Sequence, residues 1–141
     1  MTDHTKIQVH RYDRDRMQRF AAWAGKTAPW LSGDIDTPTC YASFEEFRPE
    51  EPAGDWFYWY DEVDYGISGE CECIFRSPPN FDVEHRMYLK AGDLFFIRIG
   101  TIARFEVIGD EPFVHLIVQM PRPPYTAEEG RPSFTSDNPA G

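Results

Sequence analysis

The stretch Trp56–Asp64, WFYWYDEVD, holds several side chains that could take part in acid–base chemistry. Glu62 and Asp64 are two residues apart, so in a β-strand their carboxyl groups would lie on one face. Two acids close together in a partly dry cavity raise the pKa of one of them, which suits a general acid or base near neutral pH. Tyr58 is a candidate proton donor, although a tyrosine also serves as a core residue.

The segment FVHLIVQM adds two polar candidates on another expected strand. His115 is flanked by apolar residues, which fits either a catalytic imidazole or a core histidine with its hydrogen bonds satisfied. Gln119 lies four residues after His115, so it faces the same side of the strand. Its amide is a candidate hydrogen-bond donor to a ligand, or else an exposed polar group.

Two arginines could bind an anionic ligand. Arg98 and Arg104 lie on either side of an expected turn, and a guanidinium group can bind a carboxylate or a phosphate through two hydrogen bonds. Arg104 alternates with Ala103 and Phe105, so it would face water if those two residues face the core.

Composition and charge exclude several classes of protein. With 141 residues the chain fits one domain, and its net charge of −10 disfavours binding to nucleic acids or anionic lipids. The sequence has no apolar run of the roughly 18 residues that a membrane span needs, and its N-terminus does not resemble a signal peptide. We therefore expect a cytoplasmic protein with a small-molecule ligand, and neither nucleic acid nor membrane as a partner.

The cysteines do not predict a metal site. Cys71 and Cys73 are two apart, and no second Cys/His pair follows at zinc-finger spacing. We expect reduced thiols that pack in the core.

Short apolar runs separated by Pro, Gly, Asp or Asn begin at Thr37 and continue to Met120. This pattern is typical of an antiparallel sandwich or barrel, and the spacing predicts about seven to nine strands. We expect a single β domain over residues 37–121.

The two ends of the chain differ from this pattern. Residues 1–36 include DRDRMQRFAAWAGK, whose helical periodicity predicts an amphipathic helix that begins near Asp13 or Asp15 and ends at Gly25; its apolar face would hold Met17, Phe20, Ala21 and Ala24. Residues 122–141 are rich in proline and small polar residues, which predicts an extended arm or disorder.

Two spaced motifs in the β region resemble those of the cupin superfamily. Glu62, six residues and Gly69 match the end of the first cupin motif, and Gly92, five residues, Arg98 and Gly100 match the frame of the second. The resemblance implies an all-β fold, a single antiparallel jelly-roll barrel with the N-terminal helical segment and the C-terminal arm attached to it.

Within that superfamily, the sequence most resembles the small cupins of the ethanolamine-utilisation type. The shared pieces are a YDE-x-D segment at Tyr60–Asp64, a GE turn at Gly69, an AGD-x-x-FI segment at Ala91–Ile97 and a last strand that ends in proline at Pro121. Each piece is short, and their order and spacing carry the resemblance.

The metal-binding histidines of the motifs are missing. Motif spacing puts the first two histidines at Trp56 and Tyr58 and the third at Ala103, so of the usual ligand set only Glu62 remains. Indole and methyl groups cannot replace imidazole as ligands. We therefore expect no metal and no other cofactor, and a cavity lined by aromatic rings in which Trp56 provides a flat wall.

These observations favour a metal-independent lyase, isomerase or dehydratase acting on a small, anionic metabolite. Glu62 with Tyr58 or His115 would move the proton, and the other candidates would bind the substrate: Trp56, Asp64, Arg98, Arg104 and Gln119. A non-catalytic metabolite-binding cupin is the alternative. A further alternative is a non-standard metal site formed by Glu62, His85 and His115 with Glu45 or Glu46. The resemblance also implies a homodimer.

Overall fold

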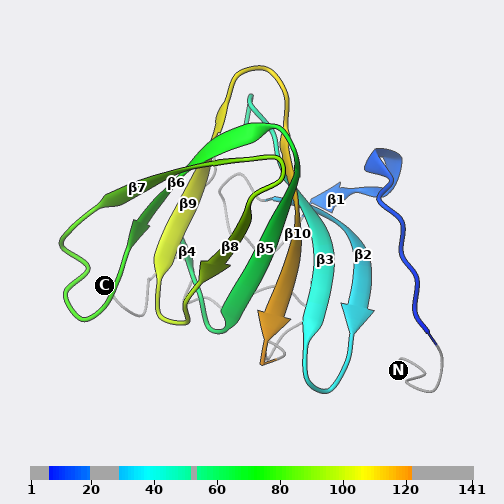
Figure 1. Cartoon of the computed structure of the whole chain (residues 1–141), viewed down its shortest axis with the longest axis horizontal. Helices are drawn as coiled ribbons and strands as arrows, with labels where there is room; N and C mark the ends of the chain where they lie inside the picture. Colours follow the sequence, from blue (N-terminus) through cyan, green and yellow to red (C-terminus); the bar gives the residue numbers. More distant parts are fainter. Residues whose placement is uncertain (1–6, 20–28, 52–53, 122–141) are drawn as a thin grey trace.

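The computed structural model describes residues 7–19, 29–51 and 54–121, which fold into two β-sheets that face each other (Figure 1). The six-stranded sheet has the order β1-β2-β3-β10-β5-β8, and the four-stranded sheet has the order β4-β9-β6-β7. The strands are β1 (Gln18–Arg19), β2 (Trp30–Asp36), β3 (Tyr41–Phe47), β4 (Trp56–Phe57), β5 (Asp61–Ser68), β6 (Glu70–Arg76), β7 (His85–Lys90), β8 (Leu94–Ile97), β9 (Ile102–Ile108) and β10 (Phe113–Met120). All strand pairs are antiparallel.

Alternation along the strands explains why the two sheets pack face to face. In β5, Glu62, Asp64 and Gly66 are buried while Tyr65 and Ile67 are exposed. Side chains two apart share a face, so one face of each sheet can be removed from water. A hydrophobic cluster between the sheets results; its buried members are Phe47, Trp56, Tyr58, Tyr60, Cys71, Cys73, Leu89, Ile97, Ala103, Phe105 and Phe113.

The region in which strands are expected is mostly β-strand, and β1 and β2 lie before its expected start at Thr37. Eight strands, β3 to β10, lie between Tyr41 and Met120, within the seven to nine that the turn spacing predicts. Cys71 and Cys73 are buried and unpaired, as expected.

The expected jelly-roll fold is confirmed, but the barrel is not closed. The two sheets form a jelly-roll sandwich in which β7 and β8, the last strands of their sheets, are not paired with each other. Each sheet is therefore open on this side, where a cavity lies.

The expected N-terminal helix is also wrong where the structure describes it. Asp13 caps only a three-residue 3-10 helix, Arg14–Arg16, by accepting a hydrogen bond from the Asp15 amide. The chain is then extended in β1, which pairs with β2. Sheet hydrogen bonds therefore replace helical ones at Gln18 and Arg19, overriding the local periodicity. Phe20, Ala21 and Ala24 lie outside the described residues, as does the predicted arm, 122–141. The described residues include no helix long and apolar enough to cross a membrane.

Gly69 is a position where a side chain would disrupt the fold. Its φ is +80°, and a Cβ there would lie 2.1 Å from the Pro112 carbonyl oxygen. We expect Gly69→Ala to lower the free energy of unfolding by roughly 3 kcal/mol, because backbone strain and a backbone clash add. Urea denaturation would measure this.

Gly109 provides the matched control. Its φ is +81°, yet nothing lies within 4 Å of a Cβ added there. Gly109→Ala should lower the free energy of unfolding by only about 1 kcal/mol, because it adds backbone strain without a clash. Equal losses in the two variants would contradict the role of the Pro112 contact.

Candidate functional site

A group of buried polar side chains lies on the inner face of the six-stranded sheet, across β3, β10 and β5. The register pairs Glu45 on β3 with His115 on β10, and Gln119 on β10 with Glu62 on β5. Asp64 lies two residues after Glu62, on the same face. We call these five residues, Glu45, Glu62, Asp64, His115 and Gln119, the acid cluster.

Side chains of the acid cluster contact one another directly. His115 Nε2 is 2.8 Å from Glu45 Oε1 and 3.6 Å from Asp64 Oδ2. The Gln119 amide donates to Glu62 Oε2 at 3.1 Å. Glu62 is 2% exposed, and Asp64 and His115 are 0% exposed. Three carboxyl groups and one imidazole are therefore held together away from solvent.

Several polar atoms of the cluster have no hydrogen-bond partner among the described residues. They are Glu62 Oε1, both Asp64 carboxyl oxygens and His115 Nδ1. An unsatisfied buried polar atom costs about 1–3 kcal/mol, so natural proteins keep few of them. Such atoms are available to a proton or to a ligand.

Burial makes the carboxyl groups weak acids. Desolvation, followed by the charge of Glu45, raises the pKa of Glu62 to about 8. Desolvation and the neighbouring Glu62 carboxylate raise the pKa of Asp64 well above its ordinary value. Two adjacent carboxyl groups in a dry site cannot both ionise, so they hold at least one proton near neutral pH.

Tyr58, Trp56 and Tyr60 lie beside the acid cluster in the core. Burial, and next the charge of Glu62, raise the pKa of Tyr58 well above its ordinary value, so its phenol is neutral. Trp56 donates from Nε1 to the Tyr60 hydroxyl at 2.8 Å. Tyr58 can therefore donate a hydrogen bond, and Trp56 is held in the core; neither residue lines the cavity between β7 and β8.

Aromatic rings hold the imidazole of His115 in place. Phe47, Phe105 and Phe113 stack on it, with centroid distances of 5.7, 5.7 and 4.8 Å. These rings and the Glu45 hydrogen bond fix the ring orientation.

A cavity of about 550 Å³ lies next to the acid cluster, between β7 and β8. Phe95 and Ile97 line it, and in the sheet they are the partners of Asp64 and Glu62. Cys73, on the opposite sheet, also lines the cavity; burial and the charge of Glu62 raise the pKa of its thiol to about 12. The carboxyl groups are thus cross-strand neighbours of two lining residues and are not themselves part of the lining.

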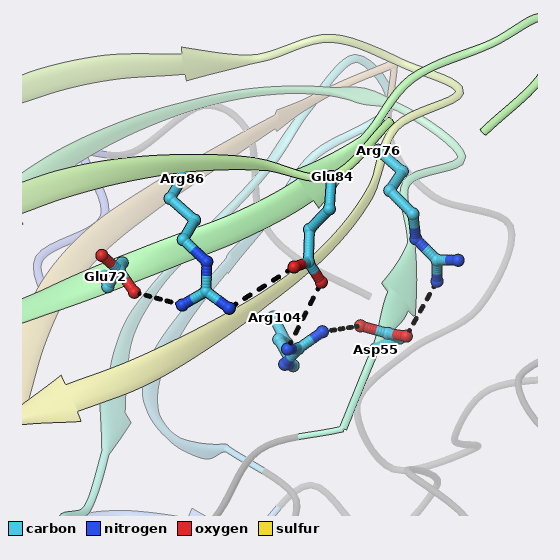
Figure 2. Close-up of polar contacts among 6 residues, drawn as sticks. All are labelled: Asp55, Glu72, Arg76, Glu84, Arg86 and Arg104. Carbon is cyan, nitrogen blue, oxygen red and sulfur yellow. Dashed lines mark hydrogen bonds and ion pairs between the residues drawn. The ribbon is translucent and has the colours of Figure 1, made fainter. Parts of the chain in front are cut away.

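The two predicted arginines lie in different places. Arg98 is exposed and lines the cavity. Arg104 is on the outer face of the four-stranded sheet, since Ala103 and Phe105 face the core. There it contacts Asp55 at 3.4 Å and Glu84 at 3.6 Å (Figure 2).

Figure 2 shows that these contacts belong to a chain of ion pairs on the outer face; its members are Asp55, Glu72, Arg76, Glu84, Arg86 and Arg104. Partly exposed pairs of this kind contribute about 0–1 kcal/mol each. The structure therefore does not bring Arg104 to the cavity.

Of the predicted site residues, the structure brings together Glu62, Tyr58, His115, Asp64 and Gln119, with Trp56 nearby. Glu45 is outside the predicted catalytic set and enters only the alternative metal set. In the strand YASFEEF, Glu45 shares one face with Tyr41 and Phe47, and Glu46 shares the other face with Ala42 and Phe44. Both faces contain apolar residues, so strand alternation alone does not say which glutamate faces the core. Glu46 faces the other side of the sheet, where Arg48 contacts it at 2.5 Å.

The metal position that the cupin motifs imply does not fit a metal here. Trp56 and Ala103 are cross-strand partners, and their indole and methyl groups are buried in the core with the Tyr58 phenol. None of these groups replaces an imidazole ligand.

A second arrangement has donor atoms close enough for an ion. Atoms of Glu45, Glu62 and His115 all lie within 4.8 Å of one another. Within this group His115 Nε2 and Glu45 Oε1 are joined by a direct 2.8 Å hydrogen bond, while His115 Nδ1 and Glu62 Oε1 have no partner among the described residues. His85 is exposed, stacks on Phe75 and is not in this group.

Comparison with solved structures defines the class of fold. The chain has the cupin fold, a double-stranded β-helix, and a cupin from Methanocaldococcus jannaschii with that fold superposes with a TM-score of 0.60 at 13% identity, over 82% of this chain and 91% of that one. The predicted cupin resemblance is confirmed.

More particular similarities are to proteins of ethanolamine utilisation. The EutQ protein of Salmonella typhimurium LT2 matches with a TM-score of 0.56 and 21% identity, over 80% of this chain and 93% of that one. The Clostridium difficile EutQ protein matches with a TM-score of 0.51 and 22% identity, over 67% of this chain and 64% of that one.

An oxalate decarboxylase from Lactobacillus farciminis is similar to the same region. Its TM-score is 0.60 at 23% identity, and the chain covers 32% of it, while 78% of the chain is matched. No family model matches the sequence, and no curated protein is significantly similar to it. Identities at this level establish the fold alone.

Proposed function

We propose that this protein is a metal-independent enzyme of the lyase, isomerase or dehydratase type, in which Glu62 and Asp64 transfer a proton to and from a small ligand. One observation carries the proposal. Two adjacent buried carboxyl groups, Glu62 and Asp64, interact through a side-chain hydrogen bond and share the site with at least one proton, beside a cavity large enough for a small molecule. Groups with pKa values moved toward neutrality are common at catalytic sites.

The other cluster members support this pair. Gln119 donates to one Glu62 oxygen and leaves Oε1 available. Tyr58 provides a neutral hydrogen-bond donor for an oxygen of the ligand that gains negative charge. When one carboxylate removes a proton from the ligand, the protonated partner returns a proton elsewhere on it, so the pair ends with the same number of protons.

The electrostatics also restrict the reacting part of the ligand. Three carboxyl groups and one imidazole surround the position, and Arg104 is on the outer face. An anionic group would be repelled there. The reacting end is therefore uncharged, and any negative charge on the ligand lies farther from the cluster than the sequence-based hypothesis implies.

A non-catalytic metabolite-binding cupin is the second candidate. It is favoured by the absence of Glu62 and Asp64 from the cavity lining, in which their cross-strand neighbours Ile97 and Phe95 take part. A binding protein needs the cavity and not the proton transfer. The homodimer that the cupin resemblance implies stays a prediction under either function.

Solvent deuterium incorporation tests the enzymatic proposal. The purified protein would be incubated in D₂O with small ketones, enoates and β-hydroxy esters, and ligand deuteration followed by NMR. We expect exchange at one carbon, reduced at least about tenfold in Asp64→Asn, which removes a proton-transferring group, and in Tyr58→Phe, which removes the hydrogen bond to the developing negative charge. Exchange that is equal in all variants would contradict the proposal, as would a stoichiometric transition metal found by elemental analysis.

A further inference from the structure

The cavity between β7 and β8 has features that restrict the ligand beyond its size. We infer that it binds a small carboxylic acid with an aromatic or branched apolar body, whose carboxylate is held at the mouth by Arg98. This inference rests on the proposed function for its setting and names the substrate class of the same site.

The inner lining is apolar. Phe75 and Ala103 belong to the four-stranded sheet, and Phe95 and Ile97 belong to β8 of the other sheet. Buried apolar area contributes about 25 cal/mol per Å², so a ring or a branched chain is the part of a ligand that gains most from this lining. The volume of about 550 Å³ admits a ligand with one aromatic ring.

The charged groups of the lining are Asp93 and Arg98. Asp93 is already engaged, since its carboxylate accepts from the Lys90 amide at 2.9 Å and lies 3.8 Å from Lys90 Nζ. Arg98 is exposed and has no ion pair with any described residue. It is therefore the group of the lining that is free to bind an anion, and guanidinium binds a carboxylate through two parallel hydrogen bonds.

Charge also sets the direction in which such a ligand enters. Phe95 and Ile97 are the sheet partners of Asp64 and Glu62, so the deep end of the cavity lies next to the acid cluster. A carboxylate would be repelled from that end and attracted to Arg98. The apolar body therefore points toward the acid cluster, and its carbon atoms are the part of the ligand nearest to Glu62 and Asp64.

Binding of three simple probes tests this inference without turnover. Phenylacetate carries both features, 2-phenylacetamide lacks the charge, and acetate lacks the ring. By calorimetry or NMR titration we expect phenylacetate to bind at least tenfold more tightly than either of the other probes. In Arg98→Gln, phenylacetate should weaken about tenfold, to the level of 2-phenylacetamide, which should itself be unaffected.

Two further variants serve as matched controls for Arg98→Gln. Arg86→Gln removes an arginine from the outer-face ion pairs and should bind phenylacetate as the wild type does. Arg76→Gln, which removes another arginine of the outer-face ion pairs, should also keep phenylacetate binding, because Arg98 and the apolar lining are intact. Equal affinity of the wild type for phenylacetate and 2-phenylacetamide would overturn the inference, and so would an unchanged affinity in Arg98→Gln. Intact binding without any proton exchange would instead contradict the proposed function alone.

Discussion

Glu62→Gln is expected to lower proton exchange by at least about 100-fold, the lower range for loss of a general acid or base. The amide keeps the shape of the carboxyl group and a carbonyl oxygen that can accept from Gln119 Nε2, the bond that Glu62 Oε2 makes at 3.1 Å. It cannot exchange a proton with a ligand, however. The measurement is the initial rate of deuterium incorporation at saturating ligand.

Glu46→Gln is the matched control for this substitution. Glu46 is as fully buried as Glu62, but it lies on the other face of β3 and contacts Arg48. It should retain the wild-type exchange rate at a temperature where circular dichroism shows both variants folded. Equal rates in Glu62→Gln and Glu46→Gln would remove Glu62 from the mechanism.

The wild-type protein is expected to lose stability as pH rises from about 5 to 8, and Glu62→Gln should lose less. The pKa of Glu62 is about 8 in the folded protein against an ordinary value of 4.5. Between these values the folded state binds more protons than the unfolded state, so the free energy of unfolding falls as pH rises. One proton contributes up to about 1.4 kcal/mol per pH unit, and the raised pKa of Asp64 acts in the same direction.

Urea denaturation at several pH values would measure this effect. Groups far from the site contribute equally to both proteins, whereas Asp64 titrates together with Glu62 because the Glu62 charge is one cause of its raised pKa. The difference between wild type and Glu62→Gln therefore reports the titration of this pair. We expect that difference to shift in favour of the variant by on the order of 3 kcal/mol between pH 5 and 8. Parallel stability curves for the two proteins would show that Glu62 titrates near its ordinary pKa and is accessible to water.

The predictions from local pattern succeeded where one physical rule dominates. Side chains two residues apart in a β-strand lie on the same face, which puts Glu62 and Asp64 on one face of β5. The same rule puts Ala103 and Phe105 in the core and Arg104 outside it. The spaced motifs also identify the cupin fold, because Gly69, Gly92 and Gly100 all adopt the positive φ that favours glycine in turns.

Local pattern failed where distant strands decide the outcome. The periodicity around Met17 fits a helix, but Gln18 and Arg19 pair with β2 instead. The predicted barrel is also not closed, because β7 and β8 do not pair. Whether these two strands pair depends on the twist of both sheets.

The sequence alone determined the all-β fold class and the face on which the acidic pair of β5 lies, since strand alternation is a local property of the backbone. Only the tertiary structure decided that Glu45 meets His115, 70 residues away, and that Arg98 lies at a cavity while Arg104 does not. The reason is that cross-strand register and the facing of two sheets depend on contacts between residues far apart in the chain. The pKa of Glu62 likewise follows from neighbours and burial that exist only after the sheets have packed.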